Sequence, residues 1–336
     1  YMQLSAFVHR YNDAIVSLAN HALSKSSEFE PTNEFKYVTG KQTVFDGDVF
    51  NSIRNCVNGA QVAMILYRLA GENGSKEGWF NLGHLLWTGH KHAQKDASLD
   101  SVSNGGIETS IPLALECFEK AVQLNDDDAR YFLAVHYIGG GVSVGAITKD
   151  VMDEHAENEK EECRIRGLKL VQEAGDNGHA GALYYLALLY RNGDSTLDVE
   201  PCMRLFREYL DEAAEGGDAD ALFMRAYCQI HGEDGYDVNM CAALDGFIMA
   251  GDAGNANGYV SAGAMLHRGI GNDTQVKQDQ RRAFELYQQA GEMGSLDGWR
   301  NVVACYIAGE GVPKCEKTAK YITKTMLSKE PAVDNN

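Results

Sequence analysis

The sequence predicts an all-α solenoid of about six stacked helix pairs, and three observations predict it. Six short segments share one pattern of small, apolar and aromatic residues, and their starts lie 51, 53, 39, 37 and 40 residues apart. Each segment ends in glycine, and each is preceded by a second pattern that ends in a tight turn. Units of this length cannot bury their apolar faces alone, so we expect them to stack on their neighbours in single file.

The first helix of each repeat, called helix A, is expected to be about twelve residues long. In most copies its first position is small, its fifth is leucine-like, its sixth is small again, its ninth is apolar or aromatic, and glycine follows. Apolar residues three and four positions apart form one face of a helix, and small residues let a neighbouring backbone come close. The pattern begins at Gly78, Ala129, Ala182, Ala221, Gly258 and Gly298.

The second helix of each repeat, called helix B, ends in a turn four residues before the next helix A. The turn residue is Gly74, Gly178, Gly217, Gly254 or Gly294. Asn125 stands at this place in KAVQLNDDDA. Asparagine tolerates the left-handed backbone conformation that closes such a turn, so the same turn is predicted there.

The ends of the chain depart from the repeat register. An amphipathic helix is predicted over 1–25, a loop over 26–47 and a degenerate helix A over 48–58. Pro313 to Leu327 would form the last helix B. We therefore divide the chain into an atypical N-terminal helical capping segment (1–60), a repeat array (61–327) and a polar C-terminal tail (328–336).

Two connections between helices A and B are longer than the others. They run from His90 to Ile111 and from Gly141 to Arg164. The second contains MDEHAENEKEE, which is open to a helical extension. Long loops of repeat proteins hang from one face and sometimes carry function, but a solvated insertion is the favoured interpretation here.

Charge argues against two classes of partner. The chain carries 48 acidic and 30 basic residues, a formal net charge of −18, without a Lys/Arg cluster. Such a surface repels nucleic acid and anionic membranes.

No apolar stretch of the sequence approaches the ~20 residues that span a bilayer. Because the sequence begins at Tyr1 and not at Met, we interpret it as a trimmed or mature fragment, and the loss of an upstream targeting segment stays open.

Eight cysteines show no C-x-x-C motif and no zinc-ligand spacing. We favour reduced, mostly buried thiols in a cytoplasmic protein. Disulfides Cys228–Cys241 and Cys305–Cys315 remain open, as does the endoplasmic-reticulum lumen or secretion if an upstream signal was removed.

Catalytic signatures are missing from the sequence: there is no P-loop, G-x-S-x-G or H-E-x-x-H. The run Gly139 to Gly141 does not follow a strand pattern, so it does not predict phosphate binding. His90 and His92 are interpreted as a chance pair rather than a metal site. Asp126 to Asp128 lie where a helix begins, and the helix dipole favours acids there. We predict no catalytic residue, no metal and no cofactor.

The repeat resembles the Sel-1-like repeat family, which is related to tetratricopeptide repeats. The resemblance covers roughly residues 60–327, and the residues that carry it best are Ala182, Leu186, Ala187, Tyr190 and Gly193, with Gly309-Glu310-Gly311-Val312-Pro313 in the last repeat. Arg225, Val303 and Asn125 depart from the pattern. The resemblance implies a right-handed α/α superhelix of about six helix pairs that serves as a protein-interaction scaffold or signalling adaptor.

Positions four and seven of helix A form a stripe, since they lie one turn apart. In related superhelices helix A faces the concave side, and the stripe is apolar in the middle and polar at both ends, as interfaces are. The simpler alternative is packing of Phe132, Tyr185 and Tyr227 on the next helix. The predicted partner-binding residues are Asn81, His84, Phe132, Tyr185, Leu188, Met224, Tyr227 and Asn301.

These observations favour a non-enzymatic adaptor that binds another protein in its concave groove. The first alternative is the regulatory or substrate-recruiting region of a larger kinase or ubiquitin-ligase assembly whose catalytic part is absent. The second is an enzyme with its site on the long loops. The sequence names neither the partner nor the oligomeric state.

Overall fold

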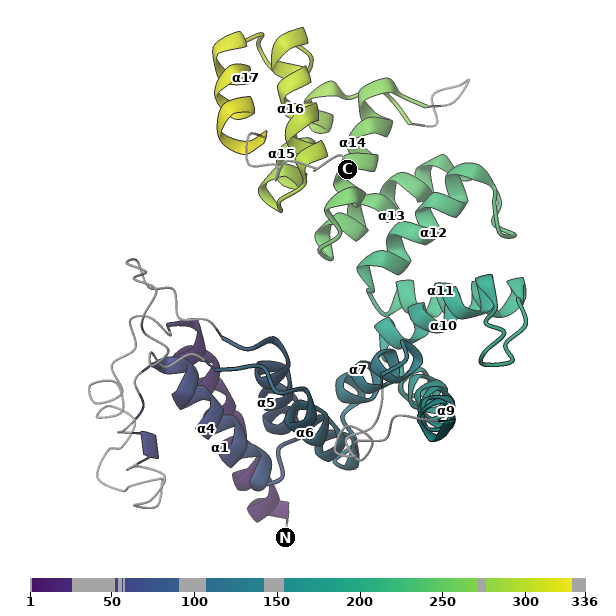
Figure 1. Cartoon of the computed structure of the whole chain (residues 1–336). Coiled ribbons are helices and arrows are strands. Elements are labelled where there is room, and N and C mark those ends of the chain that lie inside the picture. Colours follow the sequence, from purple (N-terminus) through teal and green to yellow (C-terminus); the bar gives the residue numbers. More distant parts are fainter. Residues whose placement is uncertain are drawn as a thin grey trace. The chain divides into compact units, whose positions relative to one another are not determined.

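The computed structural model describes residues 2–25, 52, 53, 56, 58–90, 107–141, 154–270 and 276–327. These residues form fourteen α-helices and one short π-helix (Figure 1). Over the described ranges there is no β-strand, and only three isolated β-bridges tie loop ends together. The all-α fold class is confirmed.

The chain divides into two compact units, Tyr1–Ala174 and Gly175–Asn336, and each is described by itself. The helices of the first unit include the two helices A predicted from Gly78 and Ala129. They are α1 (Met2–Ser24), α4 (Gly59–Glu72), α5 (Lys76–Thr88), α6 (Ile111–Gln123), α7 (Asp127–Ile138) and α9 (Glu154–Asp176), whose last residues belong to the second unit. The core between α1, α4 and α5 is dominated by Leu66, Tyr67 and Leu82.

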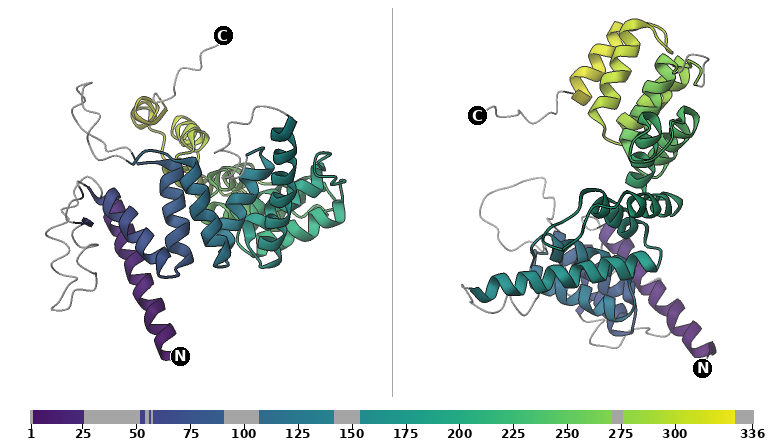
Figure 2. Two further views of the ribbon diagram at one scale, coloured as in Figure 1. Left: turned by 60° about the horizontal axis from the view of Figure 1, so that its bottom comes forward. Right: turned by 90° about the vertical axis from the view of Figure 1, so that its right-hand side faces the viewer.

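The second unit holds four further helices A and their helices B, which Figure 2 shows in two views. The helices A are α10 (Ala180–Asn192), α12 (Ala219–His231), α14 (Ala256–Arg268) and α16 (Leu296–Ala308). The helices B are α11 (Met203–Glu215), α13 (Met240–Asp252), α15 (Gln280–Glu292) and α17 (Glu316–Ile322), which continues as a π-helix over Thr323–Leu327. Their apolar faces form two adjoining core clusters.

Within each unit, helices that follow one another in sequence pack together. In the second unit α10 contacts α11, α12 contacts α13, and each helix B also contacts the next helix A. Helix A of one repeat touches helix A of the next only slightly, as α14 and α16 do. This nearest-neighbour pattern is the packing expected of a solenoid.

The turns between helices B and A have the predicted left-handed backbone. Asn125 has φ 60°, and the five glycines at the same place have φ between 83° and 114°. A residue with a Cβ is strained in this conformation, and asparagine is the common exception to glycine. The interpretation of Asn125 as the glycine substitute is confirmed.

Each helix A begins with a side chain that caps its backbone N–H groups. The capping residues are Ser75, Asp126, His179, Asp218, Asn255 and Ser295. Such caps satisfy amides that have no partner inside the helix. The assignment of the acidic run to a helix start is therefore confirmed.

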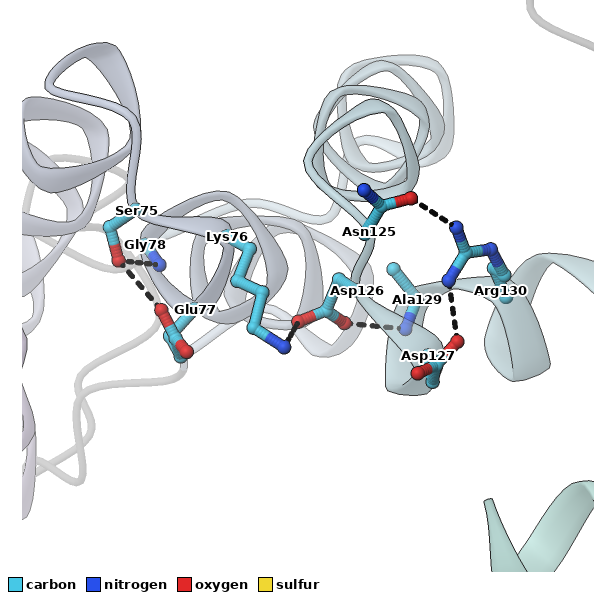
Figure 3. Close-up of polar contacts among 9 residues, drawn as sticks. All are labelled: Ser75, Lys76, Glu77, Gly78, Asn125, Asp126, Asp127, Ala129 and Arg130. Carbon is cyan, nitrogen blue, oxygen red and sulfur yellow. Dashed lines mark hydrogen bonds and ion pairs between the residues drawn. The ribbon is translucent and has the colours of Figure 1, made fainter. Parts of the chain in front are cut away.

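The cap of α7 also connects two repeats (Figure 3). One carboxylate oxygen of Asp126 accepts a hydrogen bond from the Ala129 amide at 2.8 Å. The other lies 3.9 Å from Nζ of Lys76 at the start of α5. Burial raises the pKa of the Asp126 carboxyl above its ordinary value, and the nearby ammonium favours its charged form. The starts of α5 and α7 are thus joined by an ion pair.

The two ends of the array differ in how well they follow the sequence pattern. The helix predicted over 1–25 is confirmed as α1, and α1 packs along α4 in the way that helix A packs along helix B. Most of the degenerate helix predicted over 48–58 lies outside the described residues. The last helix B begins at Glu316 rather than Pro313, because Gly309 and Gly311 take positive φ and Cys315 stands at the N-cap.

The predictions on loops and cysteines have different outcomes. The helical extension is confirmed, since α9 begins at Glu154. Residues 91–106 and 142–153 of the two long loops lie outside the described residues. All eight cysteines are free thiols, so neither of the two disulfides left open is present.

Candidate partner-binding faces of helix A

Positions four and seven of helix A point away from the densest packing in both units. Position four is half-buried in all six repeats, and position seven is half-buried or exposed. By contrast, the small residue that opens helix A is buried in every repeat. The stripe predicted from the sequence is therefore accessible on each helix A, although its surroundings differ between the units.

In the first unit the stripe consists of two residues on α5 and two on α7. Asn81 is half-buried and His84 is exposed on α5. On α7, Phe132 is half-buried and Val135 is 40% exposed. His84 and Val135 are thus the more exposed residues of this face.

Phe132 belongs to an aromatic cluster. Its ring centroid lies 4.4 Å from that of Phe118 on α6 and 5.0 Å from that of Trp87 on α5, where the two rings meet edge to face. Trp87 also meets the His136 ring at 5.3 Å. Such pairs add about 0.5–1.5 kcal/mol beyond area burial. Phe132 thus supports the face from within, which is the packing alternative weighed from the sequence.

Sequence reasoning missed Trp87 as a member of this face. It occupies position ten of α5, outside the four-and-seven stripe. One signal was available, since position ten lies one turn beyond position seven. Trp87 and Phe132 come together only because α5 and α7 pack around α6, which the local pattern does not encode.

In the second unit the stripe is more continuous between neighbouring repeats. Tyr185 and Leu188 are half-buried on α10, and Met224 is half-buried on α12. Tyr227, also on α12, is 40% exposed, and its ring centroid lies 4.5 Å from that of the tilted His231 ring one turn on.

Arg191 joins the two helices that carry this part of the stripe. Its guanidinium lies 2.7 Å from the Asp234 carboxylate that follows α12, and 3.7 Å from the sulfur of Met224. Because Arg191 lies in the last turn of α10, this ion pair fixes α10 against α12. Tyr185 and Leu188 on α10, and Met224 and Tyr227 on α12, thus lie on two helices that the Arg191–Asp234 ion pair connects.

The last two repeats present a small and polar stripe. Ser261 and Ala264 are half-buried on α14. On α16, Asn301 is half-buried and Ala304 is exposed. A partner would find hydrogen-bonding groups here rather than rings, in keeping with the polar rim of an interface.

The described residues offer little for catalysis. No group of three or more His, Cys, Asp or Glu side chains in the described ranges is placed to hold a metal ion. His92 lies outside the described residues, so the His90–His92 pair is not placed.

Two of the buried cysteines are poor nucleophiles. Burial raises the pKa of the Cys117 thiol to about 11, and burial together with Asp234 raises that of Cys228 to about 11. A thiol with a raised pKa is mostly protonated and unreactive at neutral pH. Cys315 differs, because its hydrogen bond with the Thr318 hydroxyl lowers the pKa of its thiol. A single such cysteine does not make a catalytic site.

The first unit also has a hollow that the sequence did not predict. It has a volume of about 350 Å³ and lies between α4, α5 and α6, on the side of helix A that bears Trp79 and Leu86. Lys120 covers the Trp79 ring at 4.3 Å. The four charged side chains in its lining are two cations and two carboxylates, Arg68, Lys120, Glu72 and Glu116. Their charges balance, so the hollow has no preference for a charged partner.

Among the residues that the structure describes, no helix is both long and apolar enough to cross a membrane. This agrees with the sequence, in which apolar stretches are short.

Three segments of the chain match the model of a known repeat. The Sel1 repeat model matches residues 101–126, 180–218 and 259–295. A Sel1 repeat protein from Oxalobacter formigenes has a similar structure, with a TM-score of 0.53 and 16% identity over 80% of this chain and 93% of that chain. Comparison with curated proteins gives no match.

Two further solved structures are similar at a lower level. A protective antigen of uropathogenic Escherichia coli, described as displaying an SLR fold, has a TM-score of 0.42 and 18% identity over 80% of this chain and 57% of that chain. An immunity protein from Pseudomonas aeruginosa has a TM-score of 0.43 and 16% identity over 86% of this chain and 83% of that chain.

Proposed function

We propose that this chain, three segments of which are Sel1 repeats, is a non-enzymatic adaptor that binds another protein along the outward face of helix A. The observation that carries the proposal is that three of the six repeats hold a large apolar side chain at position seven, Val135, Leu188 and Tyr227, and none of the three is buried. Val135 on α7 and Tyr227 on α12 hold the same register position, and each is 40% exposed. An apolar surface that extends over neighbouring residues marks an interaction site, and Tyr185, Leu188, Met224 and Tyr227 provide such a surface on α10 and α12.

Three properties of the chain favour a protein, rather than another class of molecule, as its binding partner. The aromatic and methionine side chains of the stripe are those enriched at the centres of protein interfaces. The net charge of −18 disfavours nucleic acid. Three segments match the Sel1 repeat, and resemblance to this family implies a role in protein interaction. In related arrays helix A faces the concave side, so the face that points away from the packing between the helices lines the concave groove, and we place the partner there.

The eight free thiols support a reducing compartment, so the proposal includes a cytoplasmic location. A disulfide found in the purified native protein would instead favour the endoplasmic-reticulum lumen or secretion.

The double substitution Tyr185→Ala and Tyr227→Ala tests the proposal. Partners are first isolated with the wild-type chain and identified by mass spectrometry, and one is then titrated against wild type and variant. We expect its dissociation constant to rise about a hundredfold, because tyrosines at interface centres are hot spots.

Met249→Ala is the matched control, since Met249 lies on helix B and is 50% exposed. We expect it to leave the affinity unchanged. Circular dichroism and thermal melts check that the double variant keeps its fold, and Tyr227→Ala alone serves if it does not. Equal affinity of wild type and folded variant would reject this surface.

A further inference from the structure

Helices B share one deeply buried position. The eighth residue after the N-cap is Phe118 in α6, Leu210 in α11, Phe247 in α13 and Tyr287 in α15. All four side chains are buried. We call this the plug position, because each side chain fills the space beside helix A of its own repeat.

The plug packs against the small residue at position six of helix A. An added Cβ on Gly83 would lie 2.8 Å from the Phe118 ring, and one on Gly263 would lie 2.7 Å from the Tyr287 ring. The ring and the missing side chain are therefore complementary in size. Within a close-packed core, reducing the ring would leave a cavity.

The last repeat breaks this arrangement on both sides. The N-cap of α17 is Cys315, so its plug position is Thr323, where α17 gives way to the π-helix. Position six of α16 is Val303 instead of glycine or alanine. Val303 has three more carbon atoms than glycine, yet it is only half-buried, and Thr323 itself is exposed.

A groove of about 470 Å³ remains at this place. Its apolar lining is Val303, Ile307 and Ala319, and Ile307 is 51% exposed. This volume falls in the range of about 300–1,000 Å³ typical of ligand sites. It is large enough for a bulky side chain together with the backbone that carries it.

The rim of the groove is positive although the chain is acidic overall. Lys320 and Lys324 line it on the exposed side of the last helix. The one carboxylate in the lining belongs to Glu316, so the groove is lined by two cations and one carboxylate and has an excess of one positive charge. An occupant with acidic residues beside its apolar side chain therefore complements the rim.

We infer that this terminal groove is a second docking site, which takes an acidic peptide segment of a partner protein and inserts one large apolar side chain at the open plug position. The geometry of the other repeats sets the size of that side chain, which is phenylalanine, tyrosine or leucine. The site uses none of the stripe residues at positions four and seven, although Ile307 at position ten of α16 lies one turn beyond them.

Four blocked peptides of nine residues provide the probes. One carries a central phenylalanine flanked by glutamates; the others replace the phenylalanine by alanine, the glutamates by lysines, or both. We expect the Phe/Glu peptide to bind tightest, with a loss of about tenfold or more for either change. Fluorescence polarisation measures affinity, and methyl NMR shifts of Ile307, Ala319 and Thr323 report the location.

Thr323→Phe fills the groove from within and is expected to abolish binding of the Phe/Glu peptide while keeping or raising the melting temperature. Thr323→Ser is the control, because it leaves the groove open and keeps a hydroxyl for the Ala319 carbonyl. If the phenylalanine variant does not fold, the exposed pair Lys320→Glu and Lys324→Glu tests the rim instead. We expect about a tenfold loss from that pair as well.

Equal binding of the Phe and Ala peptides, or binding that survives Thr323→Phe, would overturn the inference. So would sedimentation data in which wild type dimerises and Thr323→Phe is monomeric, since a second copy would then occupy the groove. Tighter peptide binding after removal of residues 328–336 would also overturn it, by making the tail the occupant.

Discussion

Phe247→Ala is expected to lower the free energy of unfolding of the second unit by about 3–5 kcal/mol. Phe247 fills the plug position of α13, is 2% exposed, and its ring centroid lies 5.2 Å from that of Phe223. Alanine would leave a cavity between helices that cannot collapse without moving their neighbours. Because each repeat is stabilised by the next, the loss at one interface weakens the stack on both sides.

Denaturant unfolding followed by circular dichroism measures this change, with Met249→Ala as the control on the same helix. Met249 is 50% exposed, so its replacement is expected to change stability by less than about 0.5 kcal/mol. A loss below about 1 kcal/mol for Phe247→Ala would mean that the plug position does not carry the packing between helices A and B.

Gly258→Ala is expected to destabilise the second unit by about 1–3 kcal/mol, although it adds a single methyl group. A Cβ at Gly258 would lie 2.4 Å from the Phe247 carbonyl oxygen and 2.8 Å from the Gly251 nitrogen. Both are backbone atoms of α13, so no side-chain rotation relieves the clash. Helices α13 and α14 would have to separate.

This close approach is accompanied by the packing of the next residue, Tyr259, whose ring lies directly against Gly251. An added Cβ on Gly251 would meet that ring at 2.3 Å. Trp79 on Gly71 and Trp299 on Gly291 repeat the arrangement, with Gly78 and Gly298 at the start of helix A. In α12 the second residue of helix A is Leu222 instead of an aromatic residue. There the position of Gly258 is occupied by Ala221, and the position of Gly251 by Ala214 at the end of α11.

Ala221→Gly is therefore the matched control for Gly258→Ala. It removes a tolerated methyl group and is expected to cost only about 0.5–1 kcal/mol through backbone entropy. The two variants are compared by denaturant unfolding. Stability of Gly258→Ala within about 0.5 kcal/mol of wild type would show that the two helices tolerate a wider spacing.

The local sequence pattern predicts most helices and turns of this molecule. It can do so because each repeat packs only on its neighbours, so few long-range contacts influence the local structure. The helices A, their glycine ends and the left-handed turn at Asn125 follow from spacing and from the conformational preference of single residues. The outward direction of positions four and seven follows from helical periodicity, given that positions one, five and six carry the small and leucine-like residues.

The sequence pattern could not predict features that depend on contacts between different helices. Phe132 stays a predicted partner contact; its packing on Trp87 and Phe118 could not be predicted, because these two residues come from two other helices. The pairing of α1 with α4 likewise needed tertiary structure, because α1 lies outside the repeat register. The departure at Val303 was visible in the sequence, whereas its relation to Thr323 required knowing that the two residues line one groove.

Photo-crosslinking from position 227 tests the central claim most directly. A photoreactive phenylalanine replaces Tyr227 on α12 or, in a matched variant, Met249 on α13, two exposed positions on opposite kinds of helix. With an identified partner present, we predict a crosslinked product from position 227 and none from position 249. A product from position 249 alone would place the partner on helix B and contradict the assignment of the binding face to helix A.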